Sequence, residues 1–301
     1  MGGGGGQVMS TQGAALAWLP PVNWDGLDLD PGENGDGSVT VVVESVDGWY
    51  DSPPLDGGDL DRALSDGAAF GPKVRGARVI AITGVVIADD PADLRAMRDE
   101  LSARAVALNP ADLTIGDADG QVLTASVRAD TDGFKHTFIA PNAFRWTVSL
   151  TAGDPRLYDA AWSSVTMSNL TGHEGWTYNP AAAYTRTYPR VYGSPTLPST
   201  AQLDNAGNVA APVMALFTGP LSAGLRLTDG TSSILMAALN TGEQIWVDTE
   251  KLAAVAPGGA NRASYILSGS QPLTVPPGGA TWSLFGSGAG TVALYWRGAW
   301  A

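Results

Sequence analysis

The sequence predicts a mainly β protein of two domains, with a single long helix in the first. Three observations support this prediction. The 301 residues include 38 Gly and 20 Pro, and only 16% of them are charged, a composition typical of turn-rich β proteins. One stretch alone has the apolar spacing of a long helix, and the second half consists of short apolar runs separated by turn residues. A chain of this length can bury two hydrophobic cores.

We divide the chain into four segments. Residues 1–36 are interpreted as a flexible N-terminal arm, because they open with a glycine run and end in an acidic, Gly-rich stretch. Residues 37–158 form the first domain, residues 159–200 a linker rich in Tyr and Pro, and residues 201–301 the second domain. The glycine run at residues 1–6 is either a natural tail or an addition to the protein, and we assign it no function.

Three longer strands are expected in the first domain. The first covers residues 39–46 and is followed by a long loop over residues 47–71, where Pro and Gly-Gly steps prevent long regular elements. Residues 78–87 are almost continuously apolar, so we expect a central strand that is buried on both faces. Residues 144–151 alternate strictly between apolar and polar side chains, which predicts a half-buried strand.

The helix is expected from Asp90 to Leu108. Asp90 is a suitable N-cap, Pro91 suits the first turn, and Asn109-Pro110 ends the helix. Its apolar side chains recur every three or four positions, so one face should pack on the sheet. These side chains are Leu94, Met97, Leu101, Ala105 and Leu108.

The remaining strands are short. They are expected at residues 113–115 and 122–128, which form a hairpin, and in the second domain at residues 213–217, 225–228, 234–237, 244–248, 264–267, 281–285 and 291–296. Even spacing of strands without helices is typical of a β-sandwich or a jelly roll.

Composition excludes several classes of function. The formal net charge is −13 with three lysines, whereas a general nucleic-acid binder needs a basic surface that displaces counterions. The absence of cysteine excludes disulfides, thiolate metal sites and cysteine nucleophiles. No apolar run approaches the roughly 20 residues that span a bilayer, and the first residues lack the features of a signal peptide, so we expect no membrane insertion.

No catalytic, cofactor or metal site stands out. The chain has no Gly-Lys phosphate-loop step and no Gly-x-Ser-x-Gly elbow. His136 and His173 lie far apart without a metal-binding spacing, and both are interpreted as ordinary polar residues. The acidic loops do not match a calcium loop, and a pair such as Glu243 and Asp248 is uninformative in a chain with 30 acidic residues. We therefore expect neither enzymatic activity nor a cofactor.

A series of short motifs runs through the chain. They are WYDSPPL at 49–55, the strand at 78–84 before the Asp90-capped helix, AGDPRLY at 152–158, TYPRVY at 187–192, NAGN at 205–208, APV at 211–213, Gly219-Pro220, Gly242-Glu243, WVDT at 246–249 and YWR at 295–297. Their order and spacing resemble the distal tail protein family of siphophages, in particular the minor tail proteins of actinobacterial phages. The resemblance covers nearly the whole chain.

The resemblance implies an N-terminal belt domain, a split barrel with one helix, that closes into a hexameric ring. Outside the ring it implies a galectin-like or jelly-roll sandwich. It places the protein in the virion, at the distal end of the tail, where the ring joins the tail tube to the baseplate or tail tip that recognises the host. The implied partners are the tail tube protein, the tape measure protein and tail-associated lysin or tip proteins. The resemblance also implies that the genomic DNA passes through the ring without specific binding. The long acidic N-terminal stretch departs from the family pattern.

Two other functions remain open. A carbohydrate-binding module would stack sugars of the host envelope on exposed aromatic rings. The candidate glycan or partner contacts are Trp300, Trp282 and Tyr265. Trp246 and Trp296 lie in alternating strands and are interpreted as core, whereas Trp300 is expected to be exposed or at an interface. A cell-wall hydrolase, the third hypothesis, has no supporting constellation of residues.

A ring carries two further expectations. Strands within residues 39–151 need edge partners, and cyclic symmetry removes edges without fibre growth, so the ring should close through the first domain. Acidic residues, for example at 117–119 or 130–132, are expected to line the bore and repel the DNA. The alternative is that the charge only keeps the assembled protein in solution.

Overall fold

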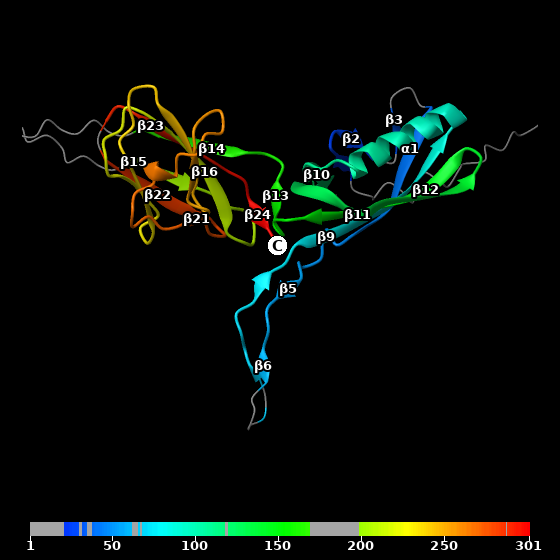
Figure 1. Cartoon of the computed structure of the whole chain (residues 1–301), viewed down its shortest axis with the longest axis horizontal. Helices are drawn as coiled ribbons and strands as arrows, with labels where there is room; N and C mark the ends of the chain where they lie inside the picture. Colours follow the sequence, from blue (N-terminus) through cyan, green and yellow to red (C-terminus); the bar gives the residue numbers. More distant parts are fainter. Residues whose placement is uncertain are drawn as a thin grey trace, which may run out of the picture. The chain divides into compact units, whose positions relative to one another are not determined.

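The computed structural model describes residues 21–29, 32–34, 38–61, 66, 68–117, 120–168, 199–286 and 288–301. The chain divides into two compact units, residues 1–160 together with residue 301, and residues 161–300. Antiparallel strands dominate both units, and the described part of the chain contains one α-helix, which lies in the first unit (Figure 1). The predicted fold class, mainly β with one helix in the first domain, is confirmed.

The first unit is a helix on an antiparallel sheet. It contains α1 (Pro91–Ala105) and the strands β1 (Val22–Trp24), β2 (Leu27–Asp28), β3 (Gly32–Asn34), β4 (Val39–Asp47), β5 (Leu55–Asp56), β6 (Leu60–Asp61), β7 (Ala68–Ala69), β8 (Val74–Arg75), β9 (Arg78–Ala88), β10 (Ala111–Gly116), β11 (Val122–Ala140), β12 (Ala143–Ala152) and β13 (Leu157–Asp159). The strand order of the main sheet is β2-β1-β10-β11-β12-β9-β4-β3, with β13 beside β11. This path does not close on itself.

Helix α1 packs against β4, β9 and β11. Leu94, Met97 and Leu101 are buried, and the Asp90 carboxylate accepts a hydrogen bond from the Ala92 amide at 2.6 Å, so the predicted cap and apolar face are confirmed. The predicted end is wrong, because α1 stops at Ala105 and Leu108 is 87% exposed. After Ala105 the chain leaves the helix and turns into β10. Leu108, the last predicted apolar position, therefore does not pack on the sheet.

Strand β9 lies at the centre of the sheet, between β4 and β12, as predicted. Burial on both of its faces is wrong. Alternate residues are buried on the side of the helix, whereas Val79 and Ile87 on the opposite side are 53% and 44% exposed. An apolar run predicts burial of both faces of a strand, but it does not show whether the chain itself covers both.

The N-terminal arm predicted for residues 1–36 is wrong where the structure describes it. Strand β1 pairs with β10 and β2, and β3 pairs with β4. The side chains of Val22, Trp24 and Leu29 are at most 2% exposed. Burial of these three side chains fixes the segment to the sheet, because it removes a large apolar area from water. Residues 1–20 lie outside the described residues.

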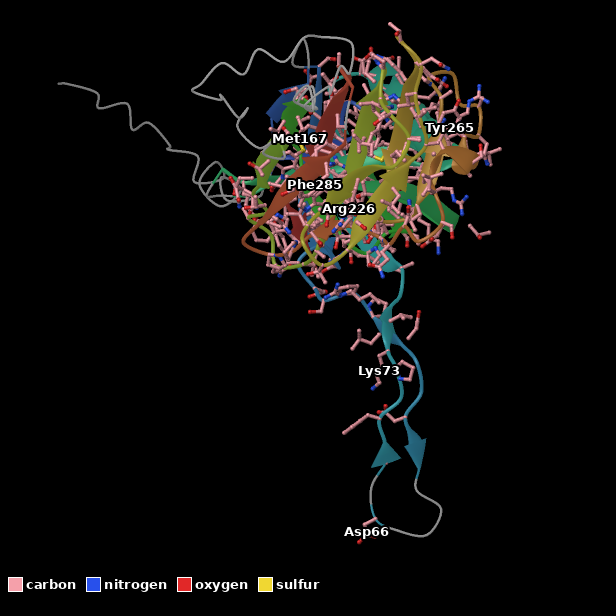
Figure 2. The ribbon with its side chains drawn as sticks, turned by 90° about the vertical axis from the view of Figure 1, so that its left-hand side faces the viewer. Asp66, Lys73, Met167, Arg226, Tyr265 and Phe285 are labelled. Atoms are coloured by element: carbon pink, nitrogen blue, oxygen red, sulfur yellow. The ribbon has the colours of Figure 1, made fainter. Side chains whose placement is uncertain are left out.

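Residues 52–77 form a two-stranded projection that we call the arm, where the sequence predicted only a loop over residues 47–71. Two short pairs of strands hold it together, β5 with β8 and β6 with β7. Figure 2 shows the arm extending from the unit, with Lys73 along it and Asp66 near its end. The arm connects β4 to β9, so it begins and ends at the same end of the sheet.

A buried arginine fixes the base of the arm. Nη1 of Arg78 donates to the carbonyl oxygens of Gly48, Trp49 and Asp51 at 3.0, 2.8 and 2.5 Å, and Nε donates to the Pro155 carbonyl at 3.0 Å. The Arg78 side chain is almost fully buried, and this burial lowers its pKa. Hydrogen bonds from a charged donor are stronger than those from a neutral donor. The bonds from Arg78 therefore hold the turn out of β4 in one conformation.

The second unit is a β-sandwich. Its strands are β14 (Ser163–Ser168), β15 (Ser199–Leu203), β16 (Ala211–Thr218), β17 (Leu225–Thr228), β18 (Ser233–Met236), β19 (Gln244–Asp248), β20 (Ala253–Val255), β21 (Thr274–Val275), β22 (Ala280–Phe285), β23 (Thr291–Trp296) and β24 (Ala299–Trp300), with a 3-10 turn η1 (Ala263–Tyr265). One sheet has the order β14-β23-β16-β19-β20, with β21 beside β16, and the other β15-β22-β17-β18.

Two predictions for this half of the chain need correction. Residues 264–267 do not form a strand, because the Asn261 side chain accepts from the Ala263 amide and starts the turn η1. Residues 163–168, assigned to the linker, form β14 and pair with β23. The second unit therefore begins nearly forty residues earlier than predicted. Residues 169–198, which include the motif at 187–192, lie outside the described residues.

Candidate interaction surfaces

The described residues offer no site for metal chemistry. Among them, no group of three or more His, Cys, Asp or Glu side chains is placed to hold a metal ion. His136 is exposed, with the rings of Phe134 and Phe138 each 5.7 Å away, and His173 lies outside the described residues. Across the ranges that the structure describes, no helix is both long and apolar enough to cross a membrane.

The candidate carboxylate pair is divided between two turns. Glu243 accepts hydrogen bonds from the Tyr265 hydroxyl and the Asn240 amide. The bond from Tyr265 lowers the pKa of the Glu243 carboxyl and raises that of the phenol. Asp248 instead accepts from the backbone of its own turn, at Glu250 and Lys251. Both carboxylates stabilise local structure.

The aromatic residues are not buried and exposed as predicted. Trp282 is fully buried between the two sheets, so its interpretation as a glycan or partner contact is wrong. Trp296 is 5% exposed and donates through Nε1 to the Asp204 carbonyl at 2.6 Å, which confirms it as core. Tyr265 and Trp300 are half-buried.

Trp246 was assigned to the core, and this is also wrong. Its neighbours Ile245 and Val247 point inward, which places Trp246 on the outer face of β19, half-buried. There its ring centroid lies 5.5 Å from that of Tyr295 on β23. Alternation along a strand shows that one face is buried but does not show which large residue occupies it.

Two of the acidic residues expected in the bore accept hydrogen bonds from side-chain hydroxyls. Asp117 accepts a hydrogen bond from the Tyr50 hydroxyl at 2.6 Å. Asp130 accepts from the hydroxyls of Ser149 and Thr151 at 2.6 and 2.5 Å. Residues 118–119 and the side chain of Asp132 lie outside the described residues.

Two strand edges of the first unit are open. On one side β11 pairs with β10 only as far as Val127, and no described strand continues along residues 128–140. At the other end of the sheet, β3 covers β4 only over residues 39–41, which leaves residues 42–47 without a described partner strand on that side. Open edges present unpaired backbone groups to other strands.

The arm carries bare apolar side chains. Phe70 is 91% exposed, Val74 66% and Leu55 63%. Scattered apolar residues are common on surfaces, but three of them on a narrow two-stranded projection are typical of a contact surface.

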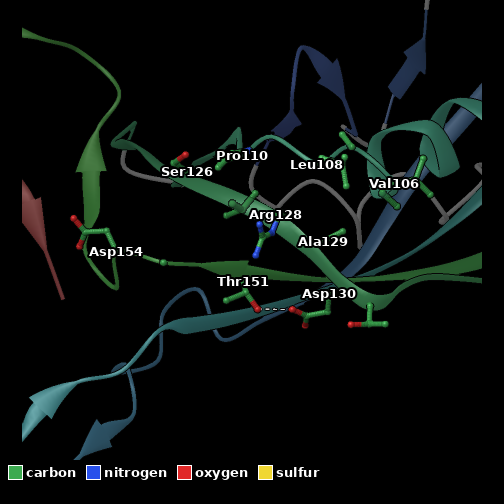
Figure 3. A pocket seen from close by; sticks show the side chains of 14 residues that line it. Val106, Leu108, Pro110, Ser126, Arg128, Ala129, Asp130, Thr151 and Asp154 are labelled. Carbon is green, nitrogen blue, oxygen red and sulfur yellow. Dashed lines mark hydrogen bonds between the residues drawn. The ribbon is translucent and has the colours of Figure 1, made fainter. Parts of the chain in front are cut away.

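A groove lies between the end of α1 and the open edge of β11 (Figure 3). Its volume is about 770 Å³. Val106 and Leu108 on its wall are 72% and 87% exposed. Arg128 is exposed, and no described side chain forms an ion pair with it. The groove thus combines an apolar wall with Arg128 and two carboxylates, Asp130 and Asp154, beside an open strand edge.

Comparison with known proteins identifies the fold. No protein-family model matches the chain, and no curated protein sequence matches it. Among solved structures, the Dit protein (gp 19.1) of phage SPP1 matches with a TM-score of 0.60 and 14% identity, over 94% of this chain and 100% of that chain. The chain has the Dit fold. The SPP1 structure is described as a paradigm of the hub adsorption apparatus in phages that infect Gram-positive bacteria.

Two structures of the phage P2 baseplate in its activated conformation, with Ca and with Sr, also match. Their TM-scores are 0.49 and 0.47, at 10% and 9% identity, over 92% of this chain and 97% of each matched chain. The family resemblance in the sequence motifs agrees with the fold that the chain shares with the SPP1 Dit protein.

Sequence analysis missed the arm's apolar residues, the groove and both open edges. Phe70 stands in a Gly- and Pro-rich stretch without periodicity, so no pattern marks it as a contact residue. Leu108 fits the helical spacing and was assigned to the core. Only the placement of these residues in the Dit fold shows that they are exposed.

Proposed function

We propose that this protein is a structural component of a phage virion, a distal tail protein that forms a ring between the tail tube and the tail-tip or baseplate machinery. The observation that carries the proposal is the extent of the structural match, 94% of this chain and 100% of the SPP1 Dit protein. A match of this extent includes both units, in one order, and not a single common domain. We place the protein at the distal end of the tail.

Ring closure through the first unit is supported by its two open edges. Strand β4 runs toward the base of the arm, and β11 runs away from it, so the two strands are antiparallel within the sheet. In a ring whose axis runs roughly along the strands, each copy is related to the next by a rotation about that axis. The strands of every copy then keep the same direction. The open edge of β4 in one copy then meets the open edge of β11 in the next as an antiparallel pair. Such head-to-tail contacts close into a ring when a whole number of these rotations makes one full turn.

The ring is proposed to be a hexamer, with the tail tube protein, the tape measure protein and tail-associated lysin or tip proteins as partners. Genomic DNA passes through without specific binding, which a net charge of −13 favours. The acidic bore stays a prediction. A ring structure whose bore is neutral or positive would remove it without affecting the tail assignment.

The purified chain tests the proposal directly. Mass photometry over a range of concentrations should show a species of six copies, and class averages from electron microscopy should show a ring with a central channel. A chain that stays monomeric at every concentration, and is monomeric in the tip complex of the virion, contradicts the proposal.

A second candidate is carbohydrate binding by the sandwich, favoured by one observation. The Trp246 and Tyr295 rings lie together on the outer face of one sheet, where aromatic rings can stack on sugars. Glycan-array binding that Trp246→Ala abolishes would support it. We further propose that the chain has no catalytic role, and turnover of cell-wall material by the purified protein would contradict this.

A further inference from the structure

An aromatic row lies on the open stretch of β11. Phe134, His136 and Phe138 occupy every second position, and each ring centroid lies 5.7 Å from the next along the strand. Their partners on β12 are buried residues of the face that α1 covers, which we call the helix face. Yet His136 is exposed, and Phe138 is 55% exposed. The aromatic row therefore continues the helix-side core beyond the part that this chain covers.

The opposite face of the same stretch carries a positive charge. Lys135 is exposed and lies opposite Thr147 of β12, on the face away from α1. Residues 133–140 contain no Asp or Glu, so Lys135 gives this stretch a net charge of +1 with His136 neutral.

The open stretch of β4 has the complementary charge. Residues 42–47 contain Glu44 and Asp47 and no Lys or Arg, a net charge of −2. Glu44 already forms an ion pair with Arg145 at 3.0 Å. Asp47 is exposed and lies opposite Ala81 of β9, on the face away from α1. Asp47 is therefore the carboxylate of this edge that can pair with a cation of another copy.

The helix face of β4 is apolar at the same place. Val43 and Val46 lie opposite Gly84 and Ile82 of β9, whose side of the sheet packs against α1. Val43 is fully buried and Val46 is half-buried. Each open edge thus has an apolar side toward the helix and a charged side away from it.

The two open stretches also lie at the same level of the sheet. Two rows of paired residues cross from β4 through β9 and β12 to β11: Val46, Ile82, Val148 and Phe134, and Val42, Val85, Arg145 and Thr137. A rotation about an axis along the strands moves no residue along that axis. It brings residues 42–47 of one copy beside residues 134–137 of the next, with a shift set by the tilt of the strands.

The pleat then decides which side chains meet. A slip of one residue would turn every side chain of a strand to the wrong face, so only registers that keep the two faces continuous bury the apolar side. In these registers Lys135 lies on the face of Asp47. The aromatic row lies on the face of Val43 and Val46.

We propose that the open stretch of β11 docks the open stretch of β4 of the next copy through both faces. Lys135 pairs with Asp47 on one face, and the aromatic row packs beside Val43 and Val46 on the other. Backbone pairing alone would accept any strand, whereas these side chains select β4 and its register. This inference rests on the proposed ring and names the side chains that join its copies.

Disulfide trapping tests the faces, because the chain has no cysteine of its own. In full-length double variants, a cysteine at Val42, Ser45 or Asp47 is combined with one at Lys135 or Thr137, all on the face away from α1. At least one combination should give cross-linked species up to the ring size under mild oxidation. Within one copy β9 and β12 separate the two cysteines, so the disulfide can form only between copies.

The matched control uses the other face of the same strand. His136→Cys or Phe138→Cys replaces the β11 cysteine and should give no cross-link with any of the three β4 positions. These side chains point to the helix face, so their Cβ atoms point away from the β4 cysteines.

Assembly of charge variants gives an independent measurement. Lys135→Glu should raise the concentration for half-maximal assembly about two- to fivefold, as expected for an ion pair near the surface. Adding Asp47→Lys should restore assembly, and the difference should shrink at high salt.

The aromatic row is tested in the same way. Phe138→Ser should raise the concentration for half-maximal assembly about tenfold, because the neighbouring copy no longer covers an apolar ring. Phe285→Ser in the sandwich, at a site 45% exposed, is the control and should leave assembly unchanged. The melting temperature of each monomer shows whether a variant is folded.

The outcomes separate this contact from the ring itself. Rings in the electron microscope with no cross-link on the predicted face, or with cross-links on both faces alike, overturn the contact and leave the ring intact. Cross-links on the predicted face with unchanged assembly of both Lys135→Glu and Phe138→Ser overturn the role of these side chains. Absence of rings and of cross-links overturns both proposals. Cross-links confined to the predicted face, with weakened assembly that Asp47→Lys restores, support the contact.

Discussion

The two units of this protein differ in how many large apolar side chains they leave exposed. Among the described residues, eleven large apolar side chains of the first unit are exposed, against three of the second. The three are Trp162, Val255 and Phe285. The second unit closes its core between two sheets, whereas the first leaves strand edges, an arm and a groove open. The sandwich closes its core within one chain, and the exposed apolar surface of the first unit supports the proposed ring, in which neighbouring copies cover part of it.

The largest effect is expected in the core of the sandwich. Trp282→Ala should lower the free energy of unfolding by about 3–5 kcal/mol, because it empties a fully buried site. Phe285→Ala on the same strand is the control and should change it by less than about 0.5 kcal/mol. Chemical denaturation of both variants measures the contrast. Equal effects would mean that the sandwich is not packed as described.

A similar pair of variants examines the first unit. Leu101→Ala should cost about 2–5 kcal/mol, because Leu101 fills the interface between α1 and the sheet. Leu108→Ala is the control and should leave the stability unchanged, because Leu108 is 87% exposed. Thermal unfolding of both variants measures the contrast. An unchanged melting temperature for Leu101→Ala would show that the placement of the helix is wrong.

The helix cap is a smaller contribution. Asp90→Ala should cost about 1 kcal/mol, because the Ala92 amide loses its acceptor. Asp90→Ser should retain most of that stability, since serine is also a good cap. Denaturant titration of both variants measures the free energy of unfolding. An equal loss for Asp90→Ala and Asp90→Ser would contradict a stabilising role for the hydrogen bond of the cap.

The smallest effect concerns pH. Burial alone would raise the pKa of the Asp154 carboxyl, but hydrogen bonds from Arg156 and Tyr158 outweigh it and lower the pKa. A lowered pKa in the folded state stabilises the protein above the unfolded value near 3.9, and this stabilisation is lost as the pH falls through the folded value. Since Asp154 is 41% exposed, we expect only about 0.2–1 kcal/mol.

Comparison of wild type with Asp154→Asn between pH 2 and pH 6 measures this term. The difference in unfolding free energy should be largest at pH 6 and should shrink toward pH 2. A difference that stays constant over this range contradicts the assignment.

Much of the fold could be predicted because local signals were strong. Asp90 and Pro91 marked the start of α1, and the strict alternation at residues 144–151 matched β12. The strands at residues 225–228, 244–248 and 291–296 were predicted to the residue. These elements form where propensity, capping and periodicity agree.

The surfaces could not be predicted because burial is decided by distant partners. Trp246 and Trp282 stand in similar alternating strands, yet one faces outward and the other lies between the sheets. The N-terminal strand β1 is three residues long, too short for any period to appear. Its place in the sheet depends on pairing with β10, where Val22 lies opposite Ile115, 93 residues further along the chain.

The sequence by itself determined the class of fold, the position of the helix, most strands of the sandwich and the absence of thiol chemistry, since these depend on residues close together in the chain or on composition alone. Only the tertiary structure decided which apolar residues are covered and which are left bare. Phe70 and Leu108 are as apolar as any residue of the core, and they are exposed because no described part of the chain packs over them. Whether a side chain is core or contact surface therefore depends on what the rest of the fold covers.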